Sequence, residues 1–318
     1  MPKVSIVIVC MNNLNNLYPC LTSIREHTSV DYETFVVAYL FSQENLRKVK
    51  RDFPWVTFIE SNEIRGFSEN NNLALRQAKG KYCFVVNDDT EMKMPVIDIL
   101  FHTIESLPEQ VAIVSPTLIN WDGTVQVCGV PPINWKTALL EKMHLWHRNK
   151  QKQYVNKQGI FKSYNIIGAA FLIKTEIFKK VGWFDERYFF CPEDIALSTT
   201  LNKMGYECYV NDDAKIIHYE GMSSKSLSLV QTATKPAARR GSIIFFSEGN
   251  VFLEAILRIL YTSITLMGFI VHFCLGAIRK CPNKYYVLAL GEWNIIKTSF
   301  SRKSPKDIFV KYYKRIKK

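Results

Sequence analysis

The chain has 318 residues, of which 47% are hydrophobic, and a formal net charge of +12. These values are typical of a globular protein with a sizeable core, in which one large domain carries an appendage. Its eight cysteines form no C-x-x-C pair and several lie in apolar runs, which indicates small buried side chains in a reducing compartment and argues against a disulfide framework.

Strand and helix patterns alternate along the first part of the chain. The expected elements are a strand at residues 3–10, a helix at 17–27, a strand at 34–38, a helix at 43–51, a strand at 56–59, a helix at 67–78 and a strand at 82–86. Such alternation predicts an α/β protein built from βαβ units around a mostly parallel sheet.

The strand at 82–86 ends abruptly at Asn87, Asp88 and Asp89. Ligands of open α/β sheets bind beyond the carboxyl ends of the strands, and two adjacent carboxylates there are costly without a positive partner. A divalent cation bound to a diphosphate is a suitable partner, because Mg²⁺ and Mn²⁺ prefer oxygen ligands. The alternative is a polar turn in which Asp89 caps the next helix.

The first strand-to-helix turn, residues 10–16, contains neither glycine nor a basic residue. A dinucleotide-binding enzyme needs G-x-G-x-x-G at this turn, and a sugar nucleotidyltransferase needs a glycine-rich basic loop for its triphosphate. The chain also lacks a P-loop motif. These absences argue against a dinucleotide-binding enzyme, a sugar nucleotidyltransferase and a P-loop NTPase, and they leave other nucleotide-binding proteins open.

The order of elements changes after about residue 110. A strand at 111–114 is followed by residues 120–165, whose irregular composition indicates a variable insertion over the site. The remaining expected elements are an apolar strand at 166–173, a short helix at 175–181, a helix from Asp194 to about 204, and strands at 207–210 and 216–218.

A series of motifs resembles family 2 glycosyltransferases in both order and approximate spacing. The motifs are Val4 to Asn12, Gly66 to Asn72, Asn87 to Thr90, Gly168 to Phe171, Gly182 to Glu186, Glu193-Asp194, Gly205-Tyr206 and His218 to Gly221. The resemblance is closest to bacterial rhamnosyltransferase-like members that build surface polysaccharide. It implies a GT-A fold over residues 1–225 and an inverting transfer from a nucleotide-sugar donor.

The resemblance also assigns residues to the donor and to a divalent cation, Mn²⁺ or Mg²⁺. Asp89 and His218 would be the metal ligands, where a cation stabilises the charge that develops on the leaving diphosphate. Taken alone, His218 after two isoleucines is more typical of a structural strand end. The implied donor-binding residues are Cys10, Asn12, Arg65, Asn71, Asn87 and Asp88.

The acceptor half of the implied site lies later in the chain. Asp194 would be the catalytic base that takes a proton from the acceptor hydroxyl, with Glu193 beside it, because a helix start favours an ionised carboxylate. Gly168, Ala169 and Asp185 would contact the acceptor. The alternatives are that Glu193 and Asp194 are ordinary first-turn charges and that Asp185 caps a turn.

The sequence departs from the family pattern at the second strand, which continues through Val37 to Phe41 without the acidic residue that usually reads the nucleobase. This departure leaves the base of the donor open. It also motivates an alternative function, a membrane-attached donor-binding or scaffold subunit with a decayed site. The Q-x-x-R-W element of processive synthases is absent after Asp194, so we expect transfer of a single sugar.

The last part of the chain, residues 226–318, is expected to form a helical region that attaches to a membrane. Residues 259–278 contain no Asp, Glu, Lys or Arg, and residues 279–318 hold twelve Lys and Arg against Glu292 and Asp307. We expect peripheral or re-entrant attachment to the cytoplasmic face, because a single span would place the basic tail outside. The alternative is a buried helix in a homodimer. Nucleic acid is not expected as a partner.

Overall fold

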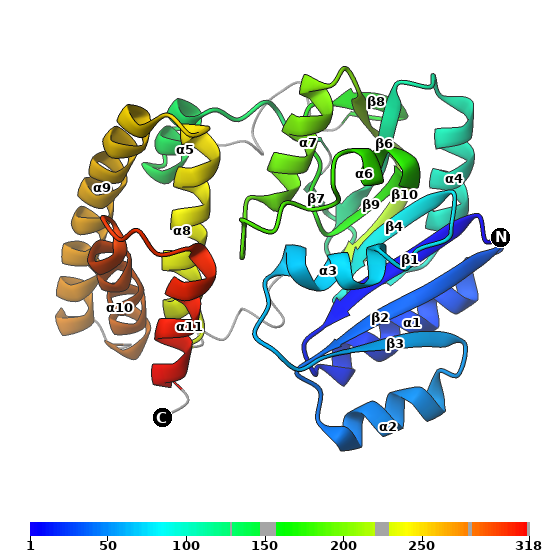
Figure 1. The fold of residues 1–318 in the computed structure, drawn as a ribbon, viewed down its shortest axis with the longest axis horizontal. Helices are drawn as coiled ribbons and strands as arrows, with labels where there is room; N and C mark the ends of the chain where they lie inside the picture. Colours follow the sequence, from blue (N-terminus) through cyan, green and yellow to red (C-terminus); the bar gives the residue numbers. More distant parts are fainter. Residues whose placement is uncertain (128, 147–156, 220–228, 279–281, 317–318) are drawn as a thin grey trace. The chain divides into compact units, whose positions relative to one another are not determined.

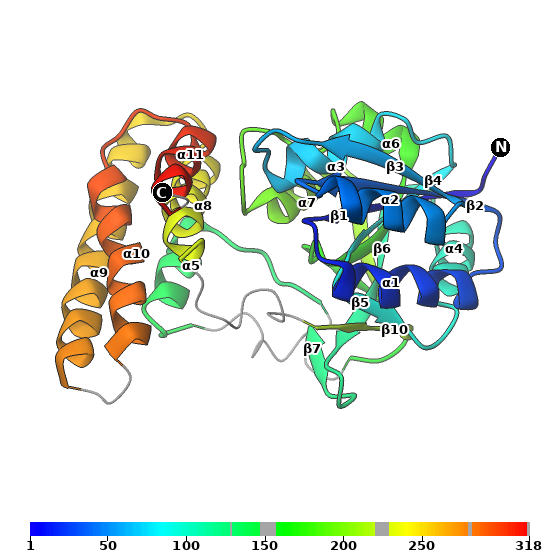
Figure 2. The same ribbon diagram turned by 90° about the horizontal axis from the view of Figure 1, so that it is seen from below.

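The structure is a computed structural model, and it describes residues 1–127, 129–146, 157–219, 229–278 and 282–316. The chain divides into two compact units. Unit 1 comprises residues 1–132, 148–185 and 193–220, and unit 2 comprises residues 133–147, 186–192 and 221–318. Unit 1 contains the sheet, whereas unit 2 is helical (Figures 1 and 2).

Unit 1 is an α/β structure. Its strands are β1 (Val4–Cys10), β2 (Tyr32–Tyr39), β3 (Val56–Ser61), β4 (Tyr82–Asn87), β5 (Thr90–Met92), β6 (Val111–Ile119), β7 (Val125–Val127), β8 (Ile160–Ser163), β9 (Ala170–Lys174) and β10 (Glu207–His218). Its helices are α1 (Leu14–His27), α2 (Gln43–Asp52), α3 (Phe67–Leu75), α4 (Val96–Ser106), α6 (Thr175–Lys180) and α7 (Glu193–Lys203).

The strands form one mixed sheet in the order β3-β2-β1-β4-β9-β6-β10-β5, with β7 beside β6 and β8 beside β10. The parallel pairing that the sequence predicts holds for β3-β2-β1-β4 and also for β6 with β10. Strand β9 lies antiparallel between β4 and β6. It therefore brings the chain segment before Ala170 back to the carboxyl end of β4.

Alternating side chains of the strands face two hydrophobic cores. Ile6 and Ile8 of β1 pack on one face of the sheet with residues of α1, α2 and α4, whereas Val7 packs on the other face with residues of α3, α6 and α7. This alternation is the period-2 pattern expected of strands that are covered on both faces. The helices of unit 1 lie on the two sides of the sheet in Figure 1.

A close backbone approach fixes the register between β1 and β4. A Cβ atom on Gly80 would lie 2.5 Å from the backbone nitrogen of Ser5, so only glycine fits at this position. The Ser5 hydroxyl accepts a hydrogen bond from the Gly80 N–H at 2.8 Å and donates one to Glu33 Oε1 at 2.6 Å. In this register Asn87, the last residue of β4, lies beside Val9 of β1.

The structure differs from the sequence prediction in several elements. The strands predicted at 207–210 and 216–218 are one strand, β10, which has a register shift between Asn211 and Lys215. Strand β9 begins only at Ala170, because residues 166–167 have no regular structure and Gly168-Ala169 form a turn. The sequence analysis did not predict β5 or α4, and it predicted residues 226–318 as helical without giving bounds for α8 or α11. Within the predicted irregular segment 120–165, the structure places β7, α5 and β8, while residues 147–156 lie outside the described residues.

Unit 2 is built from α5 (Trp135–Lys142), α8 (Gln231–Ser247), α9 (Val251–Ile278), α10 (Pro282–Thr298) and α11 (Pro305–Ile316). Helices α9 and α10 lie side by side as a hairpin (Figures 1 and 2). Near the start of α9, the Glu254 carboxylate bonds to Arg240 of α8 at 2.6 Å and to Arg258 at 2.7 Å. Arg258 also donates to the backbone oxygens of Ser299 and Ser301, so this network ties α8 and α9 to the loop that follows α10.

Helix α9 has two different faces. Leu257 and Tyr261 are buried against α5 and α8, whereas Ile259, Met267 and Ile270 point away and are more than half exposed. Within the described residues, α9 is the one helix that is long and apolar enough to cross a membrane, and 17% of its most apolar window is buried. Many apolar side chains of α9 are thus not buried by the other helices of unit 2.

Candidate functional site

The carboxyl ends of the first four strands in the sheet meet at one edge. Cys10 at the end of β1 is paired with Ala38 of β2, and Tyr39 at the end of β2 is paired with Ser61 of β3. Asn87 ends β4 beside the same part of β1. The structure thus places Cys10, Asn87 and the two carboxylates that follow it where the sequence analysis expected the donor.

Asp88 lies in a partly buried environment next to Cys10. The pKa of its carboxyl group is raised to about 7, mainly by burial and also by the Asp89 charge, while a hydrogen bond with the Cys10 thiol acts in the opposite direction. Burial also raises the pKa of the Cys10 thiol well above its ordinary value. A positive charge at this edge would favour the ionised form of Asp88, so the local electrostatics suit a cation.

Asp89 faces His218 across the pairing of β5 with β10. Thr90 and His218 are opposite each other in this antiparallel pair, and the Tyr219 N–H donates to the Asp89 carbonyl oxygen at 2.9 Å. His218 Nε2 lies 3.4 Å from Asp89 Oδ1, and each side chain is only about a tenth exposed. Residues 129 positions apart in the chain therefore point at one place, as the sequence analysis expected of metal ligands.

Gln126 of β7 holds the other side of the His218 ring, a contact that the sequence analysis missed. Its Oε1 lies 2.8 Å from His218 Nδ1, and its Nε2 donates to Asn120 Oδ1 at 3.3 Å. This amide orientation assigns the ring proton to Nδ1 and leaves the Nε2 lone pair facing Asp89. Such a carbonyl partner is the usual means of orienting a metal-binding histidine. Gln126 lies in an irregular segment that offers no sequence signal.

A divalent cation fits the residues present at this edge. The described residues contain no group of three or more His, Cys, Asp and Glu that could hold a metal by themselves. Mg²⁺ and Mn²⁺ in nucleotide sites are commonly bound by one or two protein groups, with phosphate oxygens and water completing the coordination. Asp89 Oδ1 and the free lone pair of His218 Nε2 provide such an incomplete set.

The Gly168-Ala169 turn links the strand end to the start of α7. The Gly168 N–H donates to Asp194 Oδ2 at 3.1 Å, and the Asn87 N–H donates to the Ala169 carbonyl oxygen at 2.9 Å. The Ile195 N–H donates to Asp194 Oδ1 at 2.8 Å, as expected of a carboxylate in the first helical turn. Glu193 opens the same helix and is buried. Asn87 and Asp194 are thus connected through two adjacent residues.

Asn72 holds the segment that contains Asp185. This fully buried side chain of α3 donates from Nδ2 to the Phe184 carbonyl oxygen at 2.9 Å and accepts at Oδ1 from the Phe184 N–H at 3.2 Å. Phe184 is itself buried against Phe67 and Phe171, so the amide and the aromatic contacts restrain the same residue. The sequence analysis placed Asn72 in a motif but gave it no role.

Three other predicted donor-binding residues use polar atoms in local bonds. Asn12, at a backbone φ of 51°, accepts at Oδ1 from the Ser42 N–H and from Asn45 Nδ2. Asn71 is buried and donates to the Phe67 carbonyl oxygen within α3. The Arg65 guanidinium donates to the Glu63 carboxylate, and the backbone N–H of Arg65 donates to the Tyr39 hydroxyl at 3.3 Å. These contacts hold the loops around the site, and binding roles for the three residues stay predictions.

Tyr39 occupies the strand end at which the sequence lacks an acidic residue. It is 8% exposed, and the next residue, Leu40, has a positive φ of 53° and donates from its N–H to the Ser61 carbonyl oxygen. The β2 end is therefore an ordered turn that presents an aromatic hydroxyl. A nucleobase at this position would meet a neutral group and not a carboxylate.

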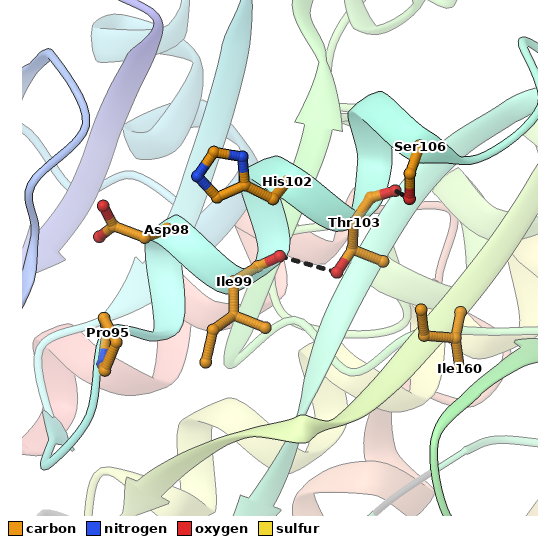
Figure 3. Close-up of a pocket in the computed structure, with 7 residues that line it drawn as sticks. All are labelled: Pro95, Asp98, Ile99, His102, Thr103, Ser106 and Ile160. Atoms are coloured by element: carbon orange, nitrogen blue, oxygen red, sulfur yellow. Dashed lines mark hydrogen bonds between the residues drawn. The ribbon is translucent and has the colours of Figure 1, made fainter.

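A surface groove of about 510 Å³ on unit 1 is separate from these groups. It is lined mainly by α4 and includes Asp98, His102 and Ile160 (Figure 3). Asp98 accepts hydrogen bonds from the N–H groups of Ser29 and Val30, which precede β2. This end of the groove lies toward the amino ends of the strands, opposite the edge that holds Asp88, so it is not part of the candidate site.

Comparison with known proteins places the chain among sugar-transferring enzymes. The sequence model of glycosyl transferase family 2 matches residues 5–182. The O-antigen biosynthesis protein RfbC of Myxococcus xanthus is 24% identical over 71% of this chain and 18% of its own length. N-acetylglucosaminyl-diphospho-decaprenol L-rhamnosyltransferase of Mycobacterium tuberculosis is 26% identical over 45% of this chain and 48% of its own length. The chain thus spans less than half of either relative.

Two solved structures have a similar fold. The mannosyltransferase PcManGT of Pyrobaculum calidifontis, in complex with GDP-Man and Mn²⁺, has a TM-score of 0.52 at 15% identity and covers 99% of this chain and 87% of its own. GalNAc-T7 with UDP, GalNAc and Mn²⁺ has a TM-score of 0.55 at 18% identity and covers 69% of this chain and 44% of its own. At these identities the likeness establishes the fold alone.

Replacing Asn72 by Asp should destabilise unit 1 by about 3 kcal/mol, because a buried carboxylate would face the Phe184 carbonyl oxygen without a donor between them. Urea denaturation measures the free energy of unfolding. The matched control is Gln77→Glu, a change of the same kind at an exposed residue just after α3, which should alter stability by less than about 0.5 kcal/mol. Equal stability of the two variants would contradict the role given to Asn72.

Proposed function

The chain belongs to glycosyl transferase family 2, and we propose that it transfers a single sugar from a nucleotide-sugar donor to a lipid-linked or glycan acceptor, with inversion at the anomeric carbon and with Mn²⁺ or Mg²⁺ bound. The membership confirms the resemblance found in the sequence motifs, and unit 1 has the expected GT-A fold. The donor, the acceptor, the metal and the membrane attachment are parts of the proposal.

The observation that carries this proposal is the link between the two halves of the site. The hydrogen bonds of Gly168 and Ala169 hold Asp194 and Asn87 to the same turn, and Asp89 faces His218 just beyond Asn87. Direct transfer needs a donor phosphate site and a base close together, because the donor and the acceptor react in one step. A fixed turn between them supports this arrangement.

Inversion follows from one displacement on the sugar. The acceptor hydroxyl oxygen forms a bond to the anomeric carbon as the bond to the donor phosphate breaks on the opposite side. The hydroxyl proton passes to the Asp194 carboxylate, whose oxygens are already oriented by the N–H groups of Gly168 and Ile195. The nucleoside diphosphate leaves with the electron pair of the broken bond.

Asp89 and His218 would hold the cation, whose chemistry is to stabilise the negative charge on the leaving diphosphate. Gln126 keeps the His218 ring oriented toward Asp89. Both solved structures with this fold were obtained with Mn²⁺ and a nucleotide or nucleotide sugar, which supports a metal-dependent reaction here. The neutral Tyr39 hydroxyl at the β2 end leaves the nucleobase of the donor open.

The acceptor that we favour is a sugar attached to a membrane lipid. One relative is a rhamnosyltransferase whose name specifies a diphospho-decaprenol substrate, and another acts in O-antigen biosynthesis. The exposed apolar face of α9 supports attachment of unit 2 to a membrane, as a peripheral or re-entrant element at the cytoplasmic face. This location would bring the enzyme to such an acceptor.

A second candidate is a donor-binding or scaffold subunit without transfer activity, which the missing carboxylate after Val37 favours. The two proposals differ in one property, because a scaffold would release no nucleotide from a bound donor. Incubation of the chain with nucleotide sugars, with and without Mn²⁺, separates them by the presence or absence of metal-dependent nucleotide release.

Replacing Asp194 by Asn should lower the rate of sugar transfer by about 1,000-fold with little change in donor affinity, because the amide cannot accept the acceptor proton. Single-turnover kinetics and donor titration measure the two quantities. Asp213→Asn, at an exposed position of β10, is the matched control and should retain the normal rate. Loss of donor binding with an unchanged rate for bound donor would show that Asp194 is not the base.

Replacing Ile259 or Ile270 by Glu should weaken binding to lipid vesicles by about tenfold each, because both residues lie on the exposed apolar face of α9 and would carry charge into the lipid. Vesicle co-sedimentation measures the affinity. Ile160→Glu, at an exposed residue of β8 in unit 1, is the control and should bind normally. If all three variants bind vesicles as tightly as the unchanged protein does, attachment through α9 is wrong.

A further inference from the structure

Unit 2 contains a cluster of three cationic side chains that the proposed sugar transfer does not use. Lys142 lies at the end of α5, and Lys235 and Arg239 lie one turn apart on α8. Helices α5, α8 and α9 pack together through Leu139, Ile243 and Tyr261. Because Lys142 follows Leu139 by three residues and Arg239 precedes Ile243 by four, both cations project from the same packed face as these contacts.

Arg239 is held in place by an aromatic ring and not by a carboxylate. The central carbon of its guanidinium lies 4.1 Å from the centre of the Tyr261 ring. Its Nε is shielded from solvent and has no hydrogen-bond partner among the described residues. A shielded N–H of a charged group without an acceptor is costly, and an anionic ligand is a natural partner for it.

The side chain of Lys235 packs closely against the backbone of α10, because residue 291 is glycine and has no side chain there. A Cβ atom at Gly291 would be 3.2 Å from Lys235 Cδ and 4.0 Å from its Nζ. Burial lowers the pKa of the Lys235 ammonium. Burial also lowers the pKa of Lys142, although that side chain retains solvent contact, and the charges of Arg239 and Lys235 lower it further. Lys142 is therefore close enough to Arg239 and Lys235 to be repelled by both.

Carboxylates near the cluster do not neutralise it. Glu292 interacts with both lysines at longer range, but its carboxylate is bound to His272 Nδ1 at 2.9 Å across the α9–α10 hairpin. Glu141, on α5, lies near Tyr261. None of the three cations is within 4.0 Å of a carboxylate oxygen in the part of the chain that the structure describes. The excess positive charge is thus left for a ligand.

We propose that Lys142, Lys235 and Arg239 bind the diphosphate group of the lipid-linked acceptor. This inference rests on the proposed function for the identity of the lipid, but the binding itself does not require catalysis. A diphosphate diester carries two negative charges and several acceptor oxygens, which suits two ammonium groups and a guanidinium better than a singly charged phospholipid does. The exposed apolar face of α9 is on the other side of this helix from Tyr261, and it gives the lipid chain a hydrophobic surface within unit 2.

The test measures binding of the full chain to three kinds of vesicle in the absence of any donor. The vesicles contain phosphatidylcholine alone, phosphatidylcholine with N-acetylglucosaminyl-diphospho-undecaprenol, or phosphatidylcholine with enough phosphatidylglycerol to give the same surface charge. We expect the diphosphate lipid to strengthen binding at least tenfold over the other two. Equal binding to the phosphatidylglycerol vesicles would overturn the proposal in favour of general surface electrostatics.

Variants locate the binding site. Lys235→Gln and Arg239→Gln should each remove most of the gain from the diphosphate lipid and leave binding to the other vesicles unchanged, whereas Arg239→Lys should keep part of it. Lys136→Gln on α5, whose Nζ lies over the Trp135 ring, is the matched control and should keep all of it. If Arg239→Gln fails to fold, Lys142→Gln and Lys235→Gln decide the matter, because both remove charges at the cluster's edge. If the diphosphate lipid strengthens binding of these two variants as much as it strengthens binding of the unchanged protein, the proposed site is wrong.

Competition distinguishes a lipid ligand from a free one. Inorganic diphosphate should displace the diphosphate lipid only weakly, because it lacks the apolar chain. If inorganic diphosphate binds as tightly as the lipid does, the cluster is a site for a soluble ligand and the assignment to the acceptor is wrong. Asp194→Asn should bind the diphosphate lipid normally, so failure of this proposal and failure of the proposed sugar transfer give different results.

Discussion

The candidate site depends on one turn, Gly168-Ala169, and its two backbone hydrogen bonds. One bond joins the end of β4 at Asn87 to the Ala169 carbonyl oxygen, and the other joins Gly168 to the Asp194 carboxylate. Both exist because β9 enters the sheet antiparallel to β4, so that the residues before Ala170 run past the carboxyl end of β4. Without this pairing the proposed metal ligands and the proposed base would belong to unrelated parts of the fold.

The difference between local patterns and contacts between distant residues explains which parts of the candidate site the sequence could predict. Asp88 and Asp89 could be proposed because a short buried strand followed by carboxylates is a local pattern. Asp194 was singled out only by the family resemblance, since acids at a helix start are by themselves ordinary first-turn charges. Gln126 and Asn72 could not be predicted, since their roles come from contacts with His218 and Phe184 that are 92 and 112 residues away in the chain. Local patterns also could not place β9, whose position is set by pairing between distant strands.

Unit 2 combines features that serve two environments. Helix α9 buries Leu257 and Tyr261 in the unit and exposes apolar residues on its opposite face, so its sequence looks apolar all round. This explains why the sequence analysis singled out the apolar stretch of α9 but gave no bounds for α8, whose first turns hold threonine, alanine and a proline and give no amphipathic signal. It also gave no bounds for α11. The charged residues of α8 then act in two ways. Arg240 bonds to Glu254 and holds the helices together, whereas Lys235 and Arg239 remain without carboxylate partners within 4.0 Å among the described residues.

The most direct test of the site is pulsed electron paramagnetic resonance of Mn²⁺ bound to the chain together with UDP, GDP or dTDP. The account predicts ³¹P couplings from the nucleotide and a ¹⁴N coupling from the imidazole, with the ¹⁴N signal lost in His218→Ala and kept in His102→Ala. A Mn²⁺–nucleotide complex that shows ³¹P couplings but no ¹⁴N coupling would contradict it. In that case His218 would be a structural residue, and Asp89 would not share a metal site with it.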